Sequence, residues 1–253
     1  MPDRYTVLQE LGLTPVWRLR SRVAAAAPSV AQDAAPELPA RTRDIVEPDR
    51  ATRIATLEWR DFATDVAACT ACVLCKTRKQ AVPGVGDPDA DWLFVGEAPG
   101  AEEDAKGEPF VGQAGRLLDN MLAALGMRRG TNVYIANVLK CRPPGNRTPT
   151  PLETESCRPY LDRQIALIRP KLIVALGKSA ATTLLNVDAT IASLRGRVHR
   201  YQGVPLIVTY HPAYLLRNLP DKAKAWEDLC LARATMRRLQ VEGDLQSAAA
   251  APN

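Results

Sequence analysis

The chain lacks long apolar segments: none of its hydrophobic runs reaches the roughly 18 residues that a membrane-spanning helix needs. The N-terminal residues MPDRYTVLQELG also lack the basic start and apolar core of a signal peptide. Neither glycine motif for nucleotide binding, G-x-G-x-x-G or G-x-x-x-x-G-K-[ST], occurs, and no internal repeat is visible. These absences exclude a membrane-spanning helix and favour a cytoplasmic setting.

The composition is that of a folded protein with a weak preference for polyanions. The 253 residues are 46% hydrophobic and 24% charged, which is ordinary for a globular protein. The net charge of +5 and the pI of about 9.0 favour negatively charged partners only mildly. One folded domain with terminal extensions is the simplest organisation.

Composition divides the chain into four parts. Residues 1–22 form a short amphipathic segment, and residues 23–50, rich in alanine, proline and charge, are predicted to be a disordered linker. Residues 51–241 hold the folded domain, and the small residues of 242–253 predict a flexible tail.

Within the domain, short apolar runs alternate with helix-like segments, which indicates an α/β fold with a parallel sheet covered on both faces. A helix is expected from about Thr52, a β-excursion at 195–205 and a closing helix at 224–241. The four apolar runs, each bounded by turn residues, are 91–97, 132–140, 171–177 and 205–211.

Ligands of an open parallel sheet bind at the carboxyl ends of its strands. Those ends bring together residues that are far apart in sequence: Glu97, Asn137, Gly177 and the run Tyr210-His211-Pro212. A carboxamide such as Asn137 offers a donor and an acceptor together, which suits one edge of a nucleobase. His211 is either a hydrogen-bonded structural residue or part of a site, and the pattern alone leaves both open.

The stretch VGEAPGAEEDAKGEPFVG, residues 95–112, combines glycines with five carboxylates. That charge argues against a phosphate cradle. Phe110 within it is either a core residue or a stacking surface for a planar ligand. Farther along, Leu215 and Leu216 precede Arg217 in an expected surface loop, where exposed leucines suggest insertion into a partner.

Six cysteines are present, and five of them fall in two groups. Cys69, Cys72 and Cys75 form a C-x2-C-x2-C run, whereas Cys141 and Cys157 lie much later in the chain. In a reducing compartment such clusters suggest a metal, and four thiolates suit a [4Fe–4S] cluster or zinc. Unrelated buried thiols are the plainer alternative, and the sixth cysteine is expected to pack in the core.

Three long motifs together resemble the family 4 uracil-DNA glycosylases, the iron–sulfur branch of these base-excision repair enzymes. They are GEAPGAEEDAKGEPFVGQAGRLLD, ANVLKCRPPGNRTPTPLETESCRPYL and HPAYLLRN, and the resemblance covers about residues 55–236. It implies a three-layer α/β/α sandwich around a four-stranded parallel sheet. The implied activity is flipping uracil out of single- or double-stranded DNA and hydrolysing its N-glycosidic bond, which leaves an abasic site.

The resemblance also implies roles for individual residues. Phe110 should stack on the uracil, Asn137 should bind its edge, His211 should face O2, and Glu97 with the Ala98 backbone should line the pocket. The ligands implied for the [4Fe–4S] cluster are Cys69, Cys72, Cys141 and Cys157, which leaves Cys75 outside the set.

The physical chemistry of base flipping is consistent with further assignments. Leu215 or Leu216 can fill the gap left by the flipped base, and Arg217 can hold a phosphate. Glu97, and second Glu103, are candidates for orienting water or screening the cationic sugar. The basic residues expected to follow DNA phosphates are Lys140, Arg142, Arg147 and Arg158.

Two alternatives stay open at this level. A non-catalytic or covalently trapping adaptor of the same fold would bind DNA damage at a replication fork, although the trapping branch has a glutamine in place of Glu97 and an arginine-rich insertion, both missing here. A second resemblance, of LQELGLTPVWRLR to the chi-binding peptide of the clamp-loader psi subunit, implies that residues 5–20 bind chi through Leu8, Leu11 and Trp17. An ordinary terminal helix is the alternative there, and a monomer is expected.

Overall fold

The computed structural model describes residues 49–249, with side chains through residue 242. The expected partner-binding peptide at 1–22 and nearly all of the expected linker at 23–50 therefore lie outside the described residues. The domain boundaries proposed from composition stay predictions. The closing helix α10, Asp221–Ala249, continues beyond the expected end at residue 241. Residues 242–249 contain no proline and are rich in alanine, which favours helix.

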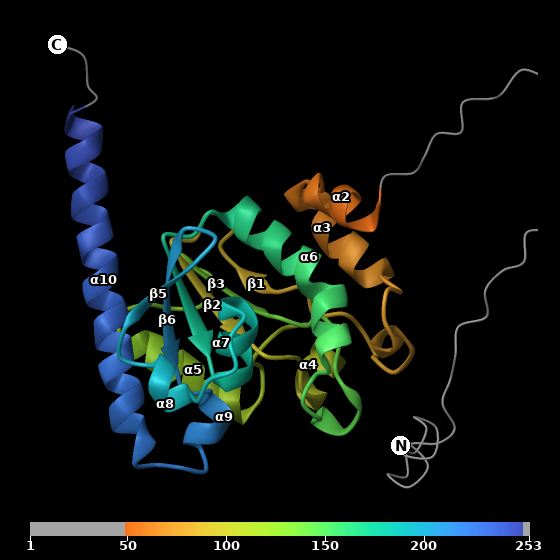
Figure 1. Cartoon of the computed structure of the whole chain (residues 1–253). Coiled ribbons are helices and arrows are strands. Elements are labelled where there is room, and N and C mark those ends of the chain that lie inside the picture. Colours follow the sequence, from red (N-terminus) through yellow and green to blue (C-terminus); the bar gives the residue numbers. More distant parts are fainter. Residues whose placement is uncertain (1–48, 250–253) are drawn as a thin grey trace, which may run out of the picture. The chain divides into compact units, whose positions relative to one another are not determined.

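The described residues contain one six-stranded sheet with the order β1-β3-β2-β4-β6-β5 (Figure 1). The four central strands are parallel, and the edge strands β1 and β5 pair antiparallel to β3 and β6. The strands are β1 Val85–Gly86, β2 Trp92–Gly96, β3 Val133–Asn137, β4 Leu172–Leu176, β5 Val198–Tyr201 and β6 Val204–Thr209.

The expected four-stranded parallel sheet is confirmed, and two short edge strands extend it. Every residue of β2, β3 and β4 is buried, as expected for strands covered on both faces. The register pairs Gly96 with Asn137 at the carboxyl ends of β2 and β3. That pairing sets the glycine backbone directly beside the carboxamide.

Helices cover both faces of the sheet, which makes the predicted three layers. Leu93 and Val95 of β2 belong to the core beneath α6 and α7, whereas Trp92 and Phe94 belong to the core beneath α5 and α10. This alternation follows from the two-residue repeat of a strand. In Figure 1 the sheet lies between α10 on one side and α6 with α7 on the other.

The helices before α10 either precede the sheet or follow one of its strands. The single helix expected from Thr52 is two helices, α2 and α3, separated by residues 56–58. The helices before α10 are α2 Arg50–Ala55, α3 Trp59–Ala68, α4 Ala101–Lys106, α5 Gln113–Ala124, α6 Pro151–Ile168, α7 Lys178–Leu185, α8 Ile191–Leu194 and α9 Pro212–Leu215, with 3-10 turns η1 Val73–Lys76 and η2 Pro144–Asn146.

Candidate functional site

A cleft of about 1120 Å³ lies at the carboxyl ends of the central strands, and we call it the base pocket. The segments that follow β2, β3 and β6 all contribute to its walls. The predicted uracil-binding and catalytic residues line it together with two of the arginines predicted to bind DNA: Glu97, Ala98, Glu103, Phe110, Asn137, Arg147, His211 and Arg217. The convergence expected from the rule for open parallel sheets therefore occurs.

Gly96 lies next to Asn137 and Phe110, which line the base pocket, and no larger residue fits at this position. A Cβ on Gly96 would lie 2.4 Å from Asn137 Oδ1 and 2.5 Å from Phe110 Cζ. Both distances are far shorter than van der Waals contact. The missing side chain therefore lets the carboxamide and the aromatic ring meet over one point of the backbone.

Asn137 ends β3 and is only 2% exposed. Its Oδ1 atom is buried and has no hydrogen-bond partner among the described residues. An unsatisfied buried acceptor costs about 1–3 kcal/mol, so such an atom requires an explanation. A ligand that donates a hydrogen bond to Oδ1 would remove this cost.

Phe110 is held in an unusual backbone conformation, with φ of 55°. Arg129 fixes it there by donating to the carbonyl oxygens of Pro109 at 2.7 Å and Phe110 at 2.8 Å. Its ring centroid lies 5.5 Å from that of His211. A left-handed φ is strained for a bulky residue, and strain of this kind is typical of residues fixed for a function.

His211 precedes α9 and accepts a hydrogen bond at Nδ1 from the backbone N–H of Ala213, at 3.1 Å. The neutral ring therefore carries its proton on Nε2, which is free to donate. Burial and, to a smaller extent, the charge of Arg217 lower the pKa of His211, and the charge of Glu103 opposes them. The resulting pKa is about 4. The imidazole is neutral at physiological pH.

The two carboxylates singled out in the acidic stretch have different surroundings. Burial raises the pKa of Glu97, a hydrogen bond from Ser179 opposes the rise, and Glu97 Oε1 has no partner in the described chain. Glu103 lies on α4 and accepts from the backbone N–H groups of Gly100 and Val111, both at 3.0 Å. Glu103 therefore joins the two ends of its own loop, whereas Glu97 keeps an oxygen available to a ligand.

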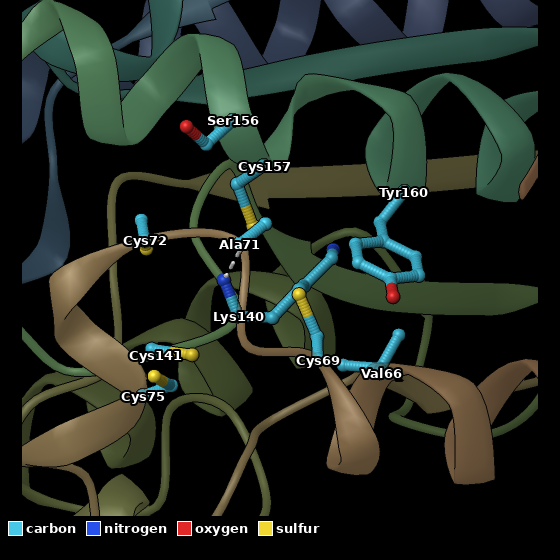
Figure 2. A pocket seen from close by; sticks show the side chains of 10 residues that line it. All are labelled: Val66, Cys69, Ala71, Cys72, Cys75, Lys140, Cys141, Ser156, Cys157 and Tyr160. Atoms are coloured by element: carbon cyan, nitrogen blue, oxygen red, sulfur yellow. Dashed lines mark hydrogen bonds between the residues drawn. The ribbon is translucent and has the colours of Figure 1, made fainter. Parts of the chain in front are cut away.

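A second, much smaller cavity is lined by five thiols, and we call it the cysteine pocket (Figure 2). The segment that follows α3 and includes η1 supplies three of them. The other two come from the segment after β3 and from α6. The thiols belong to Cys69, Cys72, Cys75, Cys141 and Cys157.

Basic groups surround these thiols. Arg78 donates to Cys141 Sγ at 2.8 Å, and Arg50 approaches Cys69 Sγ at 3.5 Å. The backbone N–H of Lys140 donates to Cys157 Sγ at 3.3 Å, the dashed line in Figure 2. Donors directed at sulfur stabilise the thiolate form, which is the form that binds metals.

Between Arg50 and Glu242, no group of three or more His, Cys, Asp or Glu side chains is gathered tightly enough to hold a single metal ion. A metal centre is therefore not itself visible. The donor set nevertheless fits an iron–sulfur cluster, because thiols from three separate segments face one cavity and cationic donors accompany them.

The chain is similar to curated proteins along most of the domain. The uracil DNA glycosylase superfamily model matches residues 83–230. The chain belongs to the uracil-DNA glycosylase superfamily.

Within this superfamily, the chain is similar to several type-4 members. It is 50% identical over 164 residues to the type-4 uracil-DNA glycosylase of Archaeoglobus fulgidus, which covers 62% of this chain and 82% of that protein. The type-4 enzyme of Thermotoga maritima is 44% identical over 177 residues, or 68% and 92% of the two chains. A type-5 enzyme of Pyrobaculum aerophilum is 34% identical over 155 residues, or 54% and 67%. The family 4 resemblance is thereby confirmed.

For this superfamily member, two expectations about the DNA-facing residues are wrong. Leu215 was expected in a surface loop, but it ends α9 and is 1% exposed, packed with Tyr210 and Ala225. Lys140 was expected to follow phosphates, but it is 1% exposed. Leu215 ends a short helix and Lys140 follows a strand end. Sequence periodicity does not reveal that either side chain is buried.

The remaining basic candidates differ in how free their charges are. Arg217 and Leu216 are exposed, Leu216 by 40%, and Arg217 lines the base pocket. Arg147 makes a bidentate pair with Glu153 at 2.6 and 2.9 Å, which also lowers the pKa of Glu153 to about 2. Arg142 donates to Asn146. Arg217 is thus the least engaged cation at the pocket rim.

Three residues that support this glycosylase fold's site were not identified from sequence: Gly96, Arg129 and Arg78. Gly96 ends β2, and the need for a small residue there becomes evident only when its pairing with Asn137 of β3 is known. The two arginines act over 19 and 63 residues of chain, on the Phe110 and Cys141 segments. Contacts of that range leave no local pattern. No helix within the described part of the chain is long and apolar enough to cross a membrane.

Proposed function

We propose that the chain is a uracil-DNA glycosylase of the type-4 branch, which hydrolyses the N-glycosidic bond of a flipped uracil and leaves an abasic site. The observation that carries the proposal is the unpartnered Asn137 Oδ1 in a pocket walled by Phe110 and a neutral His211. Relatives named type-4 uracil-DNA glycosylase are 43–50% identical to this chain over the aligned residues.

Recognition of uracil follows from the carboxamide. Asn137 Oδ1 would accept from N3–H of the base, and its amide would donate to O4, while Phe110 stacks on the ring. Cytosine presents the reverse pattern, an acceptor at N3 and a donor at N4. Binding cytosine would leave buried groups unpaired, at a cost of about 1–3 kcal/mol per group.

The chemical step separates charge. As the bond between the sugar C1′ and uracil N1 breaks, its electron pair leaves with the base, and the sugar becomes transiently cationic. His211 would donate from Nε2 to O2 and stabilise the uracil anion, because a donor fixed before the reaction does not need to reorganise. A water molecule then adds to C1′ and gives its proton to the carboxylate of Glu97.

Glu97 is the carboxylate that best suits the cationic sugar and the water. Its Oε1 is buried with no hydrogen-bond partner in the described part of the chain, and Glu97 lines the pocket together with Asn137 and His211. Glu103 already accepts from three backbone N–H groups. We assign Glu103 to holding the loop in which Phe110 lies, and Glu97 to the reacting centre.

Contacts with DNA are proposed for the exposed residues after α9. Leu216 would enter the gap that the flipped base leaves, and Arg217 would bind a phosphate next to it. Leu215 has no such role, because it is buried beneath them. Arg142 and Arg147 are secondary phosphate contacts at the other rim.

The cysteine pocket is proposed to hold a [4Fe–4S] cluster. When bound, the cluster would supply four iron–thiolate bonds that fasten three segments of the chain to one another. The ligands would be Cys69, Cys72, Cys141 and Cys157, with Cys75 in the lining but outside the set.

The experiment that tests the function is release of uracil from an oligonucleotide that contains one uracil, in single- and double-stranded form. The full-length protein should release it, and Asn137→Ala or His211→Ala should each lower kcat/KM by about 10²–10³-fold. His199→Ala is the matched control: this second histidine lies on β5 and contacts the backbone carbonyl of Leu194 in α8, so its loss should leave kcat/KM unchanged. Intact DNA after prolonged incubation with the cluster-loaded protein would refute the proposal.

We propose separately that residues 5–20 bind the clamp-loader chi subunit. The support is the spacing of Leu8, Leu11 and Trp17 alone. Chi should bind a fluorescent peptide of residues 5–20 and should not bind the same peptide carrying Trp17→Ala; absence of binding to the first peptide contradicts the assignment.

A further inference from the structure

The segment that carries His211 lies between two tyrosines. Tyr210 precedes it directly after β6, and the backbone N–H of Tyr214 donates to the His211 carbonyl at 2.9 Å. The two tyrosine rings stack, with centroids 5.2 Å apart and planes inclined by 12°. Such a stack is stabilising beyond the area that it buries. It therefore closes a small loop of chain around the proposed hydrogen-bond donor to uracil.

Arg195 lies over one of these two rings. It follows α8, and its guanidinium carbon is 5.6 Å from the centroid of the Tyr210 ring. A guanidinium is attracted to an aromatic face, most strongly where water is excluded, and Tyr210 is only 7% exposed. The contact therefore restrains Tyr210 from a separate part of the chain.

Carboxylates of α10 hold both ends of this arrangement. Arg195 donates from Nε to Asp228 Oδ2 at 3.0 Å, and Asp228 is 1% exposed. A buried charge pair needs close geometry to offset its desolvation, so the guanidinium has little freedom to move. At the other end, the Tyr214 hydroxyl donates to Asp221 Oδ2 at 2.6 Å. The segment between the tyrosines is thus tied to the long helix twice, and α8, α9 and the start of α10 lie near one another in Figure 1.

The imidazole of His211 has close neighbours of its own. Its Nδ1 accepts from the Ala213 N–H at 3.1 Å. On the side of β4, a Cβ at Gly177 would lie only 2.9 Å from the Cβ of His211. A shift of residues 210–214 would therefore break the bond to Nδ1 or change where the ring points. Misplacement by about 1 Å can cost roughly a hundredfold in rate, so the restraint on Tyr210 bears on the reaction.

We propose that Arg195 is a positioning residue for His211. Anchored to α10 by Asp228, it holds the stack of Tyr210 on Tyr214. The stack in turn orients His211 so that Nε2 points to O2 of the flipped base. The proposal rests on the proposed function, and it gives a part in the chemical step to α10, none of whose described residues lines the base pocket.

The first test is a double-mutant cycle between Arg195→Met and His211→Ala, read as the single-turnover rate of uracil release at saturating protein. Arg195→Met alone should lower this rate by about 10–100-fold. It should leave binding of uracil-containing DNA unchanged, because Asn137 and Phe110 keep their places. In the His211→Ala background it should cause no further loss, since there is no imidazole left to orient. Losses that multiply in the double variant would overturn the proposal, because they indicate general destabilisation.

Arg163→Met is the matched control for loss of a half-buried arginine. Arg163 of α6 donates from Nε to the backbone carbonyl of Leu57, between α2 and α3, at 2.7 Å. The variant should lower the melting temperature and leave the single-turnover rate unchanged. A loss of rate equal to that of Arg195→Met would overturn the proposal, because any weakened arginine contact would then have the same effect.

A milder variant keeps the proposal testable if Arg195→Met does not fold. Asp228→Asn preserves the shape of the anchor and removes its charge, so Arg195 is held less firmly. It should give a smaller loss of the single-turnover rate, and that loss should also vanish in the His211→Ala background. An Asp228→Asn loss that persists there contradicts the proposal.

The second test observes His211 without measuring activity. The chain has two histidines, so nitrogen-15 NMR shows two imidazoles, and His211→Ala identifies which signals belong to His211. In the wild-type protein the bond from Ala213 keeps the ring proton on Nε2, which separates the signals of the two ring nitrogens. In Arg195→Met these two signals should move towards each other, and in Arg163→Met they should not.

His211 signals that keep their wild-type positions in Arg195→Met would overturn the proposal. A wild-type protein that releases no uracil would refute the proposed function instead, and the NMR comparison would still decide whether Arg195 holds His211.

Discussion

The two pockets have different electrostatics although they are joined by one short stretch of chain. The strand ends of the base pocket supply neutral or acidic groups, namely a neutral His211, the carboxamide of Asn137 and the half-buried Glu97, while Arg147 and Arg217 also line it. The cysteine pocket is bordered by cations, with Arg78 and Arg50 directed at thiols. The first suits a site where a sugar becomes cationic, and the second suits an anionic group of thiolates.

The difference teaches how one loop can serve both sites. Asn137 and Cys141 are four residues apart, so the segment after β3 begins in one pocket and ends in the other. A change at either end of this segment should therefore be felt at the other, and each prediction below separates a local effect from a shared one.

The largest effect is expected for Cys141→Ala. It should abolish iron content and visible absorbance and lower the melting temperature, because losing one ligand releases a bond that fastens distant segments. Cys75→Ala is the matched control and should retain the iron, although Cys75 lines the same pocket. Iron analysis and thermal unfolding measure both; loss of iron in Cys75→Ala would contradict the ligand set.

Gly96→Ala should damage the base pocket alone. Its Cβ would displace Asn137 Oδ1 or the Phe110 ring, and misplacement by about 1 Å costs roughly a hundredfold in kcat/KM. Gly126→Ala provides the comparison, since its φ of 76° makes alanine strained but no atom of the described residues lies within 4 Å of a Cβ placed there. It should lower the melting temperature and leave kcat/KM unchanged. Iron content should stay at the wild-type level in both glycine variants. A Gly96→Ala protein with full activity would show that the space around Gly96 tolerates a methyl group.

Leu215 and Leu216 should give opposite results despite being neighbours. Leu215→Ala should lower the free energy of unfolding by about 2–5 kcal/mol, because it leaves a cavity in the core. Leu216→Ala should leave stability unchanged and weaken binding to uracil-containing duplex by about tenfold, the effect of roughly 1.4 kcal/mol of lost apolar contact. Chemical denaturation and fluorescence anisotropy distinguish them. The wedge assignment fails if Leu216→Ala binds duplex as tightly as wild type.

The smallest effect is expected when the pH is changed near neutrality and kcat/KM is measured. The pKa of His211 is lowered to about 4, so the ring is neutral in the folded protein above that value and protonated in the unfolded chain below about 6.5. This group therefore withdraws stability as pH falls from about 6.5 to 4, and it leaves kcat/KM flat between pH 6 and 8. A single-turnover pH profile in the Glu97→Gln background isolates it. An inflection near 6.5 would show that His211 is not buried as described.

The sheet and the composition of the base pocket were predictable because they depend on local patterns. Apolar runs identified β2, β3, β4 and β6, and the rule for strand ends brought Glu97, Asn137 and His211 together. The two-residue strand β1 was missed, since a pair at Val85–Gly86 has no periodicity to detect.

The parts that failed depend on three-dimensional packing. Nothing local distinguishes Leu215 from Leu216, and only the turn of α9 decides which one points inward. Residues 101–106 of the acidic stretch form α4, which no apolar periodicity predicts; there the Glu103 side chain accepts from the backbone N–H of Gly100, the N-cap residue. Lys140 was expected at the surface because an unpaired buried lysine is rare; its partners come from residues 137 and 164.

The unpartnered oxygen of Asn137 has a consequence for the end of the catalytic cycle. Because Gly96, Arg129 and the backbone of Ala213 fix the pocket without any contribution from DNA, the detached base meets the same complementary groups as the base in the strand. Free uracil should therefore compete with substrate, and departure of the product rather than bond cleavage should limit turnover when uracil accumulates.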